Sequence, residues 1–257
     1  MTIDILTLFP TMFEAPLGES IIGRAMAKGI LSIRCHQIRE YTTNRQNQVD
    51  DYPYGGGRGC VMTAQPLYDC WKHAVSLDGT PARTIYFSPR GKVFDQADAI
   101  RLARDYGRLI FVCGHYEGVD QRFIDAAVDE EISLGDFVVT GGEIPAMAVA
   151  DAVCRLVPGV LADESCFMDE SHWNGLLEHP HYSRPETWEG RSVPEILRSG
   201  HHAEIDKWRR KQALLTTLRR RPDMFAKLDF SPADRKLLAE LSEETDDPLL
   251  QTTLDTI

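Results

Sequence analysis

The 257-residue chain is poor in cysteine, and its cysteines form no recognisable metal or redox pattern. There is no C-x-x-C pair and no histidine pair at zinc-ligand spacing. We therefore expect free thiols in a reducing compartment and no metal site. Irregular spacing also favours surface or hydrogen-bonding roles for the later histidines (His172, His179, His181, His201 and His202). The six cysteines are Cys35, Cys60, Cys70, Cys113, Cys154 and Cys166.

Long apolar runs are missing as well. No stretch approaches the ~18 residues that a membrane span needs, and the opening MTIDILTLFPTMF lacks the positively charged region of a signal peptide. We expect a cytoplasmic protein with no membrane partner. Hydrophobic residues make up 43% of the chain, enough for one sizeable core and a smaller second domain.

The common nucleotide-binding motifs are absent too. No G-x-G-x-x-G follows the first expected strand, and no G-x-x-x-x-G-K-[ST] occurs anywhere. A Rossmann dinucleotide site and a P-loop therefore have no support in the sequence.

Charge is unevenly distributed along the chain, whose net charge is −11. From Glu240 onward there are six acids and no base, so residues 242–257 are expected to form a solvated, disordered acidic tail. Between Ile205 and Pro222 the sign reverses, and only Asp206 opposes the bases. This stretch is a candidate phosphate-binding surface, and Trp208 within it suits RNA contacts. The bases are Lys207, Arg209, Arg210, Lys211, Arg219, Arg220 and Arg221.

Hydrophobic periodicity predicts an α/β domain followed by a helical one. Apolar runs alternate with amphipathic segments up to Leu156, a pattern typical of a parallel sheet with helices on its faces. Beyond Pro158 and Gly159 the chain becomes polar, so we expect a domain over 1–159, a flexible linker over 160–174 and a helical domain over 175–241. The expected strands are 3–8, 30–38, 83–89 and 108–114, and the expected helices are 20–28, 66–75, 94–106, 144–156, 202–221 and 232–241.

Glycine-rich loops follow the expected strands. They are SPRG at 88–91, GHYEGVD at 114–120 and GDFVVTGGEIP at 135–145. Each could be an ordinary turn. Three such loops at neighbouring strand ends favour a ligand site, because open α/β sheets bind ligands at this edge. Glycine also lets main-chain groups approach a flat ring such as adenine.

These loops, with YPYGGGRG before them and GLLEHPHYSRPETWEG and SGHHAEIDKWRRKQ after them, resemble the bacterial tRNA (guanine-N1)-methyltransferase family. The resemblance extends from about Ile3 to Phe225. It implies a trefoil-knotted domain of the SPOUT class, with a parallel sheet flanked by helices, plus a small, mostly helical C-terminal domain that binds tRNA. It also implies a homodimer whose subunits share the active site.

The activity implied by the resemblance is methylation of N1 of guanosine at tRNA position 37, with S-adenosylmethionine as the methyl donor. A requirement for Mg²⁺ stays open. The residues implied to bind the donor are Tyr86, Ser88, Pro89, Gly114, Tyr116, Glu117, Gly118, Leu134, Gly135, Asp136, Phe137, Val138, Val139, Gly141, Gly142 and Pro145.

The family's catalytic pair is an aspartate that precedes a serine in the linker and an arginine at the end of the last helix of the knot. Here the arginine is Arg155, whereas Glu170 fills the carboxylate position before Ser171, and Asp169 stands one residue earlier. A carboxylate and a cation suit removal of the N1 proton and the charge that develops on O6. Glu170 is the preferred base and Asp169 the alternative. Two other functions stay open: methylation of a ribose or of ribosomal RNA, and an inactive RNA-binding module.

Overall fold

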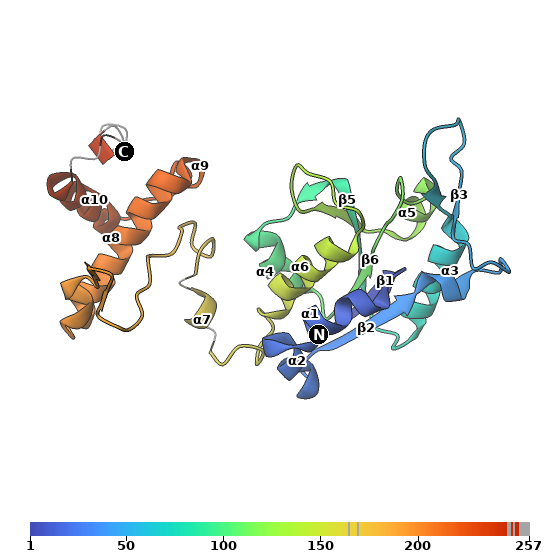
Figure 1. Ribbon diagram of the computed structural model, residues 1–257, viewed down its shortest axis with the longest axis horizontal. Helices are drawn as coiled ribbons and strands as arrows, with labels where there is room; N and C mark the ends of the chain where they lie inside the picture. The colour runs from blue at the N-terminus through green and yellow to red at the C-terminus, as the bar shows by residue number, and fades with distance from the viewer. Residues whose placement is uncertain (164, 169, 246–247, 249, 252–257) are drawn as a thin grey trace. The chain divides into compact units, whose positions relative to one another are not determined.

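The computed structural model describes residues 1–163, 165–168, 170–245, 248 and 250–251. The chain divides into two compact units, Met1–Glu164 and Ser165–Ile257 (Figure 1). Among the described residues, no helix has both the length and the apolar character needed to cross a membrane.

A five-stranded, wholly parallel sheet forms the centre of the first unit, in the order β2-β1-β6-β5-β7. Asp4 of β1 lies opposite Arg34 of β2 on one side and Ile110 of β6 on the other. The predicted parallel sheet flanked by helices is thereby confirmed. The strands are β1 (Thr2–Thr7), β2 (Ser32–Gln37), β5 (Arg83–Val93), β6 (Arg108–Val112) and β7 (Glu130–Ser133).

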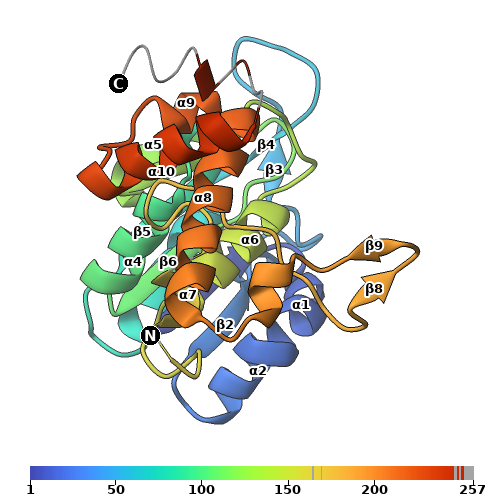
Figure 2. The same cartoon turned by 90° about the vertical axis from the view of Figure 1, so that its left-hand side faces the viewer.

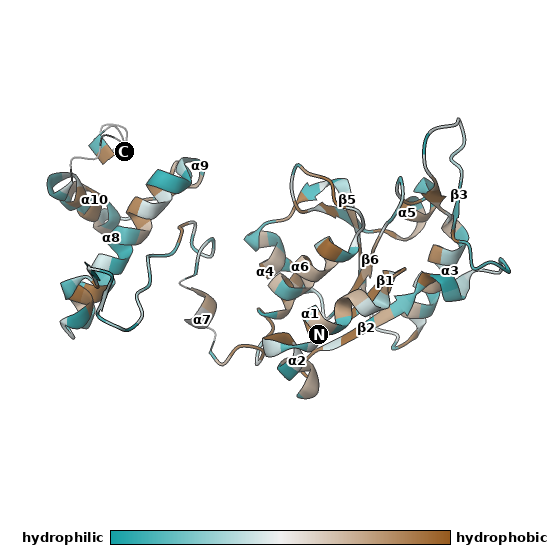
Figure 3. Ribbon diagram, in the orientation of Figure 1, coloured by the Kyte–Doolittle hydropathy of each residue, from teal (hydrophilic) through white to brown (hydrophobic). Residues whose placement is uncertain are grey.

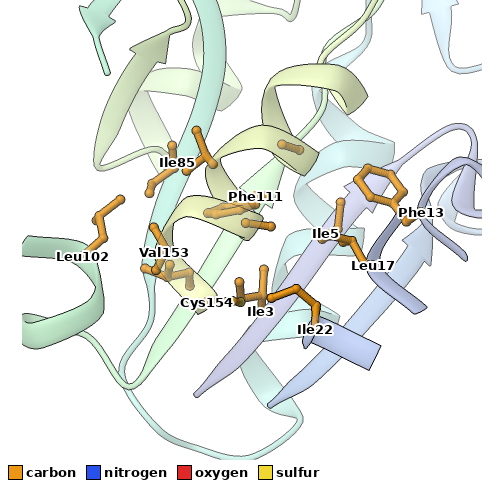
Figure 4. Close-up of a cluster of buried hydrophobic side chains, with 14 of the residues drawn as sticks. Ile3, Ile5, Phe13, Leu17, Ile22, Ile85, Leu102, Phe111, Val153 and Cys154 are labelled. Atoms are coloured by element: carbon orange, nitrogen blue, oxygen red, sulfur yellow. The ribbon is translucent and has the colours of Figure 1, made fainter. Parts of the chain in front are cut away.

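Helices cover both faces of this sheet because successive side chains of its strands point to opposite faces. Ile3 and Ile5 pack with Val153 in one buried cluster (Figure 4). Leu6 packs with Leu67 on the other face. The first cluster includes residues of α1 (Glu14–Gly18), α2 (Ser20–Ala27), α4 (Gln96–Asp105) and α6 (Glu143–Cys154), and the second includes α3 (Ala64–Ser76) and α5 (Gln121–Ala127). The shorter elements are η1 (Pro10–Phe13), η2 (Ile38–Tyr41), β3 (Asp50–Asp51) and β4 (Val61–Met62).

One segment differs from the sequence-based expectation, and for a second the sequence analysis gave no secondary structure. The SPRG segment does not follow a strand, because β5 continues to Val93 with a register shift in which Phe87 and Lys92 both face Ile132 of β7. Residues 137–142, all of them described, form no strand. Local apolar content indicated neither the bulge nor the open loop, since both depend on how neighbouring strands pair.

A buried ion-pair network crosses the sheet between β2, β1 and β6. Asp4 is fully buried and accepts hydrogen bonds from Arg34 (2.7 Å), His36 (2.8 Å) and Arg108 (2.9 Å). Arg108, only 2% exposed, also donates to Asp78. Burial raises the pKa of Asp4, but hydrogen bonds from His36, Arg34 and Arg108 outweigh it and hold that pKa well below its usual range.

The second unit is built around the long helix α8 (His202–Arg220) and helix α10 (Pro232–Glu244). Leu214 and Leu218 of α8 pack with Leu238 and Leu241 of α10. Both helices alternate between hydrophilic and hydrophobic residues along their length, as amphipathic helices do (Figure 3). The other elements are α7 (Ser165–Met168), β8 (Thr187–Trp188), β9 (Arg191–Ser192), η3 (Glu195–Arg198) and α9 (Pro222–Phe225).

The basic stretch is more neutralised than its sequence suggested. Lys211 is buried and contacts Glu240 (3.0 Å) and Glu244 (2.6 Å), and Lys207 also contacts Glu240 (2.9 Å). Hydrogen bonds from the two lysines lower the pKa of Glu240 to about 2. Three arginines pair as well: Arg209 with Asp206, Arg210 with Asp234 and Arg221 with Asp223. Three cations of α8 (Lys207, Arg210 and Lys211) therefore pair with acids of α10 and hold the two helices together.

The acidic tail predicted over 242–257 does not begin at residue 242. Residues 242–244 form the last turn of α10, and Leu250 is fully buried in the core of the second unit. Acidic composition suggested a solvated terminus. However, Lys211 of α8 pairs with Glu244, and Leu250 packs in the core of the second unit.

The described thiols are free, as the sequence predicted for Cys35, Cys60, Cys70, Cys113 and Cys154. Burial raises the pKa of Cys35 to about 11 and that of Cys154 to about 12, so both stay protonated at neutral pH.

Candidate functional site

A pocket of about 430 Å³ lies in the first unit, where β5, β6 and β7 meet their following loops and the start of α6. All the residues expected to bind a methyl donor line it except Gly135 and Asp136. These two lie within the same loop, which turns through Gly135 (φ +149°). The lining residues that were expected are Tyr86, Ser88, Pro89, Gly114, Tyr116, Glu117, Gly118, Leu134, Phe137, Val138, Val139, Gly141, Gly142 and Pro145.

Sequence reasoning missed eight further lining residues: Phe87, Arg90, His115, Val119, Gln121, Ile132, Ser133 and Thr140. His115, Val119 and Thr140 belong to the glycine-rich loops already singled out, and Arg90 belongs to the SPRG segment. Including every residue of these loops would have found those four. Ile132 and Ser133 line the pocket from β7, and the sequence carried no signal for this.

Gly114 lets the chain pass close to a buried tyrosine ring. A Cβ at this position would lie 2.8 Å from Cε2 of Tyr86, closer than real side-chain contacts allow. Burial raises the pKa of Tyr86, and its hydroxyl accepts a hydrogen bond from the backbone of Val119. The phenol is therefore a neutral, fixed part of the pocket wall at physiological pH.

The loop after β6 is anchored by the residues that directly follow the YPYGGGRG run. Glu117 N donates to Cys60 O (2.9 Å), and Met62 N donates to Gly118 O (2.9 Å). A Cβ at Gly59 would lie 2.6 Å from Oε1 of Glu117, so a larger residue would displace this carboxylate. Tyr116 adopts a left-handed conformation (φ +60°) that is uncommon for residues other than glycine.

A buried carboxylate joins two loops of the pocket. Glu143 lies in the first turn of α6, is 1% exposed, and accepts hydrogen bonds from Thr7 Oγ1 (2.6 Å) and His115 Nε2 (2.6 Å). Both carboxylate oxygens are thus engaged, one by a hydroxyl of β1 and the other by the imidazole of the loop after β6. Gly141 passes so close that a Cβ would overlap the His115 ring.

Two apolar side chains of the pocket lining are largely exposed. Phe137 is 58% exposed and Val138 is 80% exposed, although both line the pocket. Exposed apolar side chains beside main-chain donors and acceptors suit a flat, heteroaromatic ligand.

The expected catalytic residues belong to different units. Arg155 caps the C-terminal end of α6 in the first unit, and its N–H donates to Asp151 O (3.1 Å). Glu170 lies in the second unit, in a turn where its N–H donates to Phe167 O (3.3 Å). Asp169 lies outside the described residues. The pairing of Arg155 with a linker carboxylate stays a prediction.

One glutamate and two histidines lie close together in the second unit. Glu178, His179 and His181 place ligand-type atoms within 4.8 Å of one another. Each of the three side chains takes part in a contact within the protein: His181 Nε2 lies 2.9 Å from Glu178 Oε1, and His179 Nδ1 donates to Pro180 O (3.2 Å).

Comparison with known proteins agrees with the resemblance drawn from the loops. The model of the family described as tRNA (Guanine-1)-methyltransferase TrmD matches residues 1–227. A tRNA (guanine-N(1)-)-methyltransferase of Clostridium novyi is 53% identical over 244 residues, covering 95% of this chain and 99% of the relative. The enzyme of that name from Alkaliphilus metalliredigens is 50% identical over 246 residues, with the same coverage. The chain belongs to the tRNA (guanine-1)-methyltransferase family.

Proposed function

We propose that this protein methylates N1 of guanosine at position 37 of tRNA, using S-adenosylmethionine bound in the pocket of the first unit. Family membership makes the chain a tRNA (guanine-N1)-methyltransferase. The position in tRNA and the identity of the donor are the finer parts of the proposal. A tRNA substrate implies that the enzyme works in the cytoplasm.

The observation that carries the proposal is the pocket with its glycine cradle. Its volume of about 430 Å³ lies within the range for small-molecule sites. Gly114 and Gly141 keep side chains out of it, and Phe137 and Val138 offer apolar contact to a purine ring. S-adenosylmethionine supplies an electrophilic methyl group when bound, and these residues fit its adenosine.

The chain itself has to make guanine N1 nucleophilic. N1 carries a proton, so a base must remove it before its electron pair can form the new N–C bond. We assign this proton to the Glu170 carboxylate, with Asp169 as the alternative, and assign the developing negative charge on O6 to the Arg155 guanidinium.

We include a trefoil knot and a shared dimer site in the proposal. Close packing of the loop before α6 against the chain after β6 supports the knot: a Cβ at Gly142 would lie 2.6 Å from Cα of Cys113, and Gly142 N donates to Gly114 O (2.9 Å). Exposed apolar side chains beside a cavity of about 250 Å³ support a second copy of the chain. They are Phe9 (42%), Met12 (41%) and Ile144 (46%).

A pair of glycine variants tests the pocket. Gly114→Ala should abolish S-adenosylmethionine binding in calorimetry, because the new methyl group collides with Tyr86. Gly107→Ala is the matched control, since a Cβ there meets nothing within 4 Å. Equal donor affinity in both variants would exclude this pocket.

A mixed dimer tests the shared site. An Arg155→Ala chain and a chain carrying Asp169→Ala with Glu170→Ala are each expected to be inactive alone. Mixed dimers should recover up to one functional site of two if arginine and carboxylate come from different subunits. Absence of recovery, with mixed dimers demonstrated by native mass spectrometry, would contradict sharing.

A further inference from the structure

An ordered hairpin in the second unit is exposed along its whole length. Every residue from 181 to 192 is exposed, yet β8 and β9 pair within this segment, with Trp188 opposite Arg191. The two-residue turn has positive φ at Glu189 (46°) and Gly190 (76°), as a type I′ hairpin requires. Figure 2 shows the hairpin extending away from α8.

Contacts at its base fix the hairpin to the unit. Val193 N donates to Glu186 O (2.9 Å), and the Arg198 guanidinium pairs with the Glu186 carboxylate. Across the strands, the hydroxyls of Thr187 and Ser192 lie 3.1 Å apart. The hairpin is therefore a preorganised structure, which lowers the entropic cost of binding a partner.

The hairpin presents a flat aromatic ring beside a cation. Trp188 is 58% exposed, and the guanidinium carbon of Arg191 lies 5.9 Å from its ring centroid. Tyr182, at the start of the same segment, is 48% exposed. Aromatic rings and guanidinium planes are the groups on which proteins stack unpaired nucleobases.

Composition favours RNA over a protein partner. Residues 181–192 (HYSRPETWEGRS) include no leucine, isoleucine, valine or methionine, whereas a stable protein interface has an apolar core. Arg184 and Arg191 add cations for phosphate, and of the two acids Glu186 is already neutralised by Arg198. In contrast, much of the charge of α8 pairs with acids of its own unit.

We propose that this hairpin is a second tRNA contact, in which Trp188 stacks on an unpaired base and Arg191 holds an adjacent phosphate. The proposal rests on the proposed function and adds to it a recognition element outside the methyl-donor pocket. Stacking on one base contributes enough affinity for its loss to weaken binding about tenfold.

Full-length Trp188→Ala and Trp188→Phe test the hairpin in filter binding of tRNA transcripts without methyl donor. Trp188→Ala should raise the tRNA Kd about tenfold, and Trp188→Phe should restore most of the affinity because phenylalanine still stacks. S-adenosylmethionine binding and thermal stability should match the unaltered protein, since the indole is exposed. Tryptophan fluorescence should be quenched by tRNA in the unaltered protein, and less so in Trp188→Phe.

An unchanged tRNA Kd in Trp188→Ala would overturn the proposal. Conversion of a dimer to a monomer in light scattering of Trp188→Ala would also overturn the proposal, because that result would make the hairpin a protein interface. Failure of the unaltered protein to methylate tRNA would refute the proposed function alone, since the binding comparison needs no methyl transfer.

Discussion

The His115 imidazole and the Glu143 carboxylate meet at 2.6 Å and join the loop after β6 to the first turn of α6. Both segments line the same pocket or adjoin its lining. Thr7 of β1 donates to the other carboxylate oxygen, so this contact ties the pocket to the central sheet.

Removing the imidazole should loosen the pocket. His115→Ala removes the hydrogen bond from the imidazole to the buried Glu143, and we expect roughly tenfold weaker S-adenosylmethionine binding in calorimetry. His202→Ala, on the exposed first turn of α8, is the control. Equal donor affinity in the two variants would show that the pair does not position the loop.

The Asp4 network should stabilise the first unit in a pH-dependent way. Asp4→Asn removes the negative charge that pairs with the buried Arg108 guanidinium. It should lower the free energy of unfolding at pH 7 by about 3 kcal/mol. Because hydrogen bonds hold the folded-state pKa of Asp4 below its unfolded value, this stability is present above pH ~4 and lost as pH falls further. Urea unfolding at pH 7 and pH 3 should show the difference between the two proteins shrinking at the lower pH. A constant difference would contradict the account.

The cations of α8 should separate into structural and exposed groups. Lys211→Gln removes contacts to Glu240 and Glu244 and should lower the stability of the second unit by about 1 kcal/mol in thermal unfolding. Arg220→Gln, on the exposed end of the same helix, should leave stability unchanged. If both variants unfold like the unaltered protein, the contacts between α8 and α10 contribute nothing measurable.

Much of the first unit could be predicted from sequence because its strands are short apolar runs between amphipathic helices. The glycine-rich loops predicted where the pocket of about 430 Å³ forms, since parallel strands bring their carboxyl ends to one edge. The continuation of β5 to Val93 could not be predicted, because the segment around Gly91 pairs only when β7 is in place. His115 and Glu143 lie 28 residues apart, and no local pattern links them.

In the second unit, counting charges along the chain overestimated the unpaired charge of the basic helix. Lys211 lies near only one acid in the sequence, but α10 brings Glu240 and Glu244 to it in the fold. Local charge balance does not include tertiary neighbours, so it could not show which cations of α8 are paired with acids of α10. The exposed Trp188 had no periodic signal, because a two-residue strand is too short to show one.

Glu170 should be the base that removes the N1 proton. Glu170→Gln keeps the size of the side chain and loses its basicity, so turnover should fall by about 100-fold or more while donor and tRNA binding persist. Asp169→Asn should have a much smaller effect. Single-turnover methyl transfer at saturating tRNA measures both. An inactive Asp169→Asn beside an active Glu170→Gln would assign the role to Asp169.

Methyl transfer to tRNA transcripts that differ only at position 37 tests the central claim most directly. With S-adenosylmethionine carrying a labelled methyl group, the transcript with guanosine at position 37 should gain one label per molecule. Nuclease digestion and mass spectrometry should identify the product as 1-methylguanosine. Transcripts with another base at that position should gain none. Equal labelling of all transcripts, or label on a ribose hydroxyl, would contradict the account.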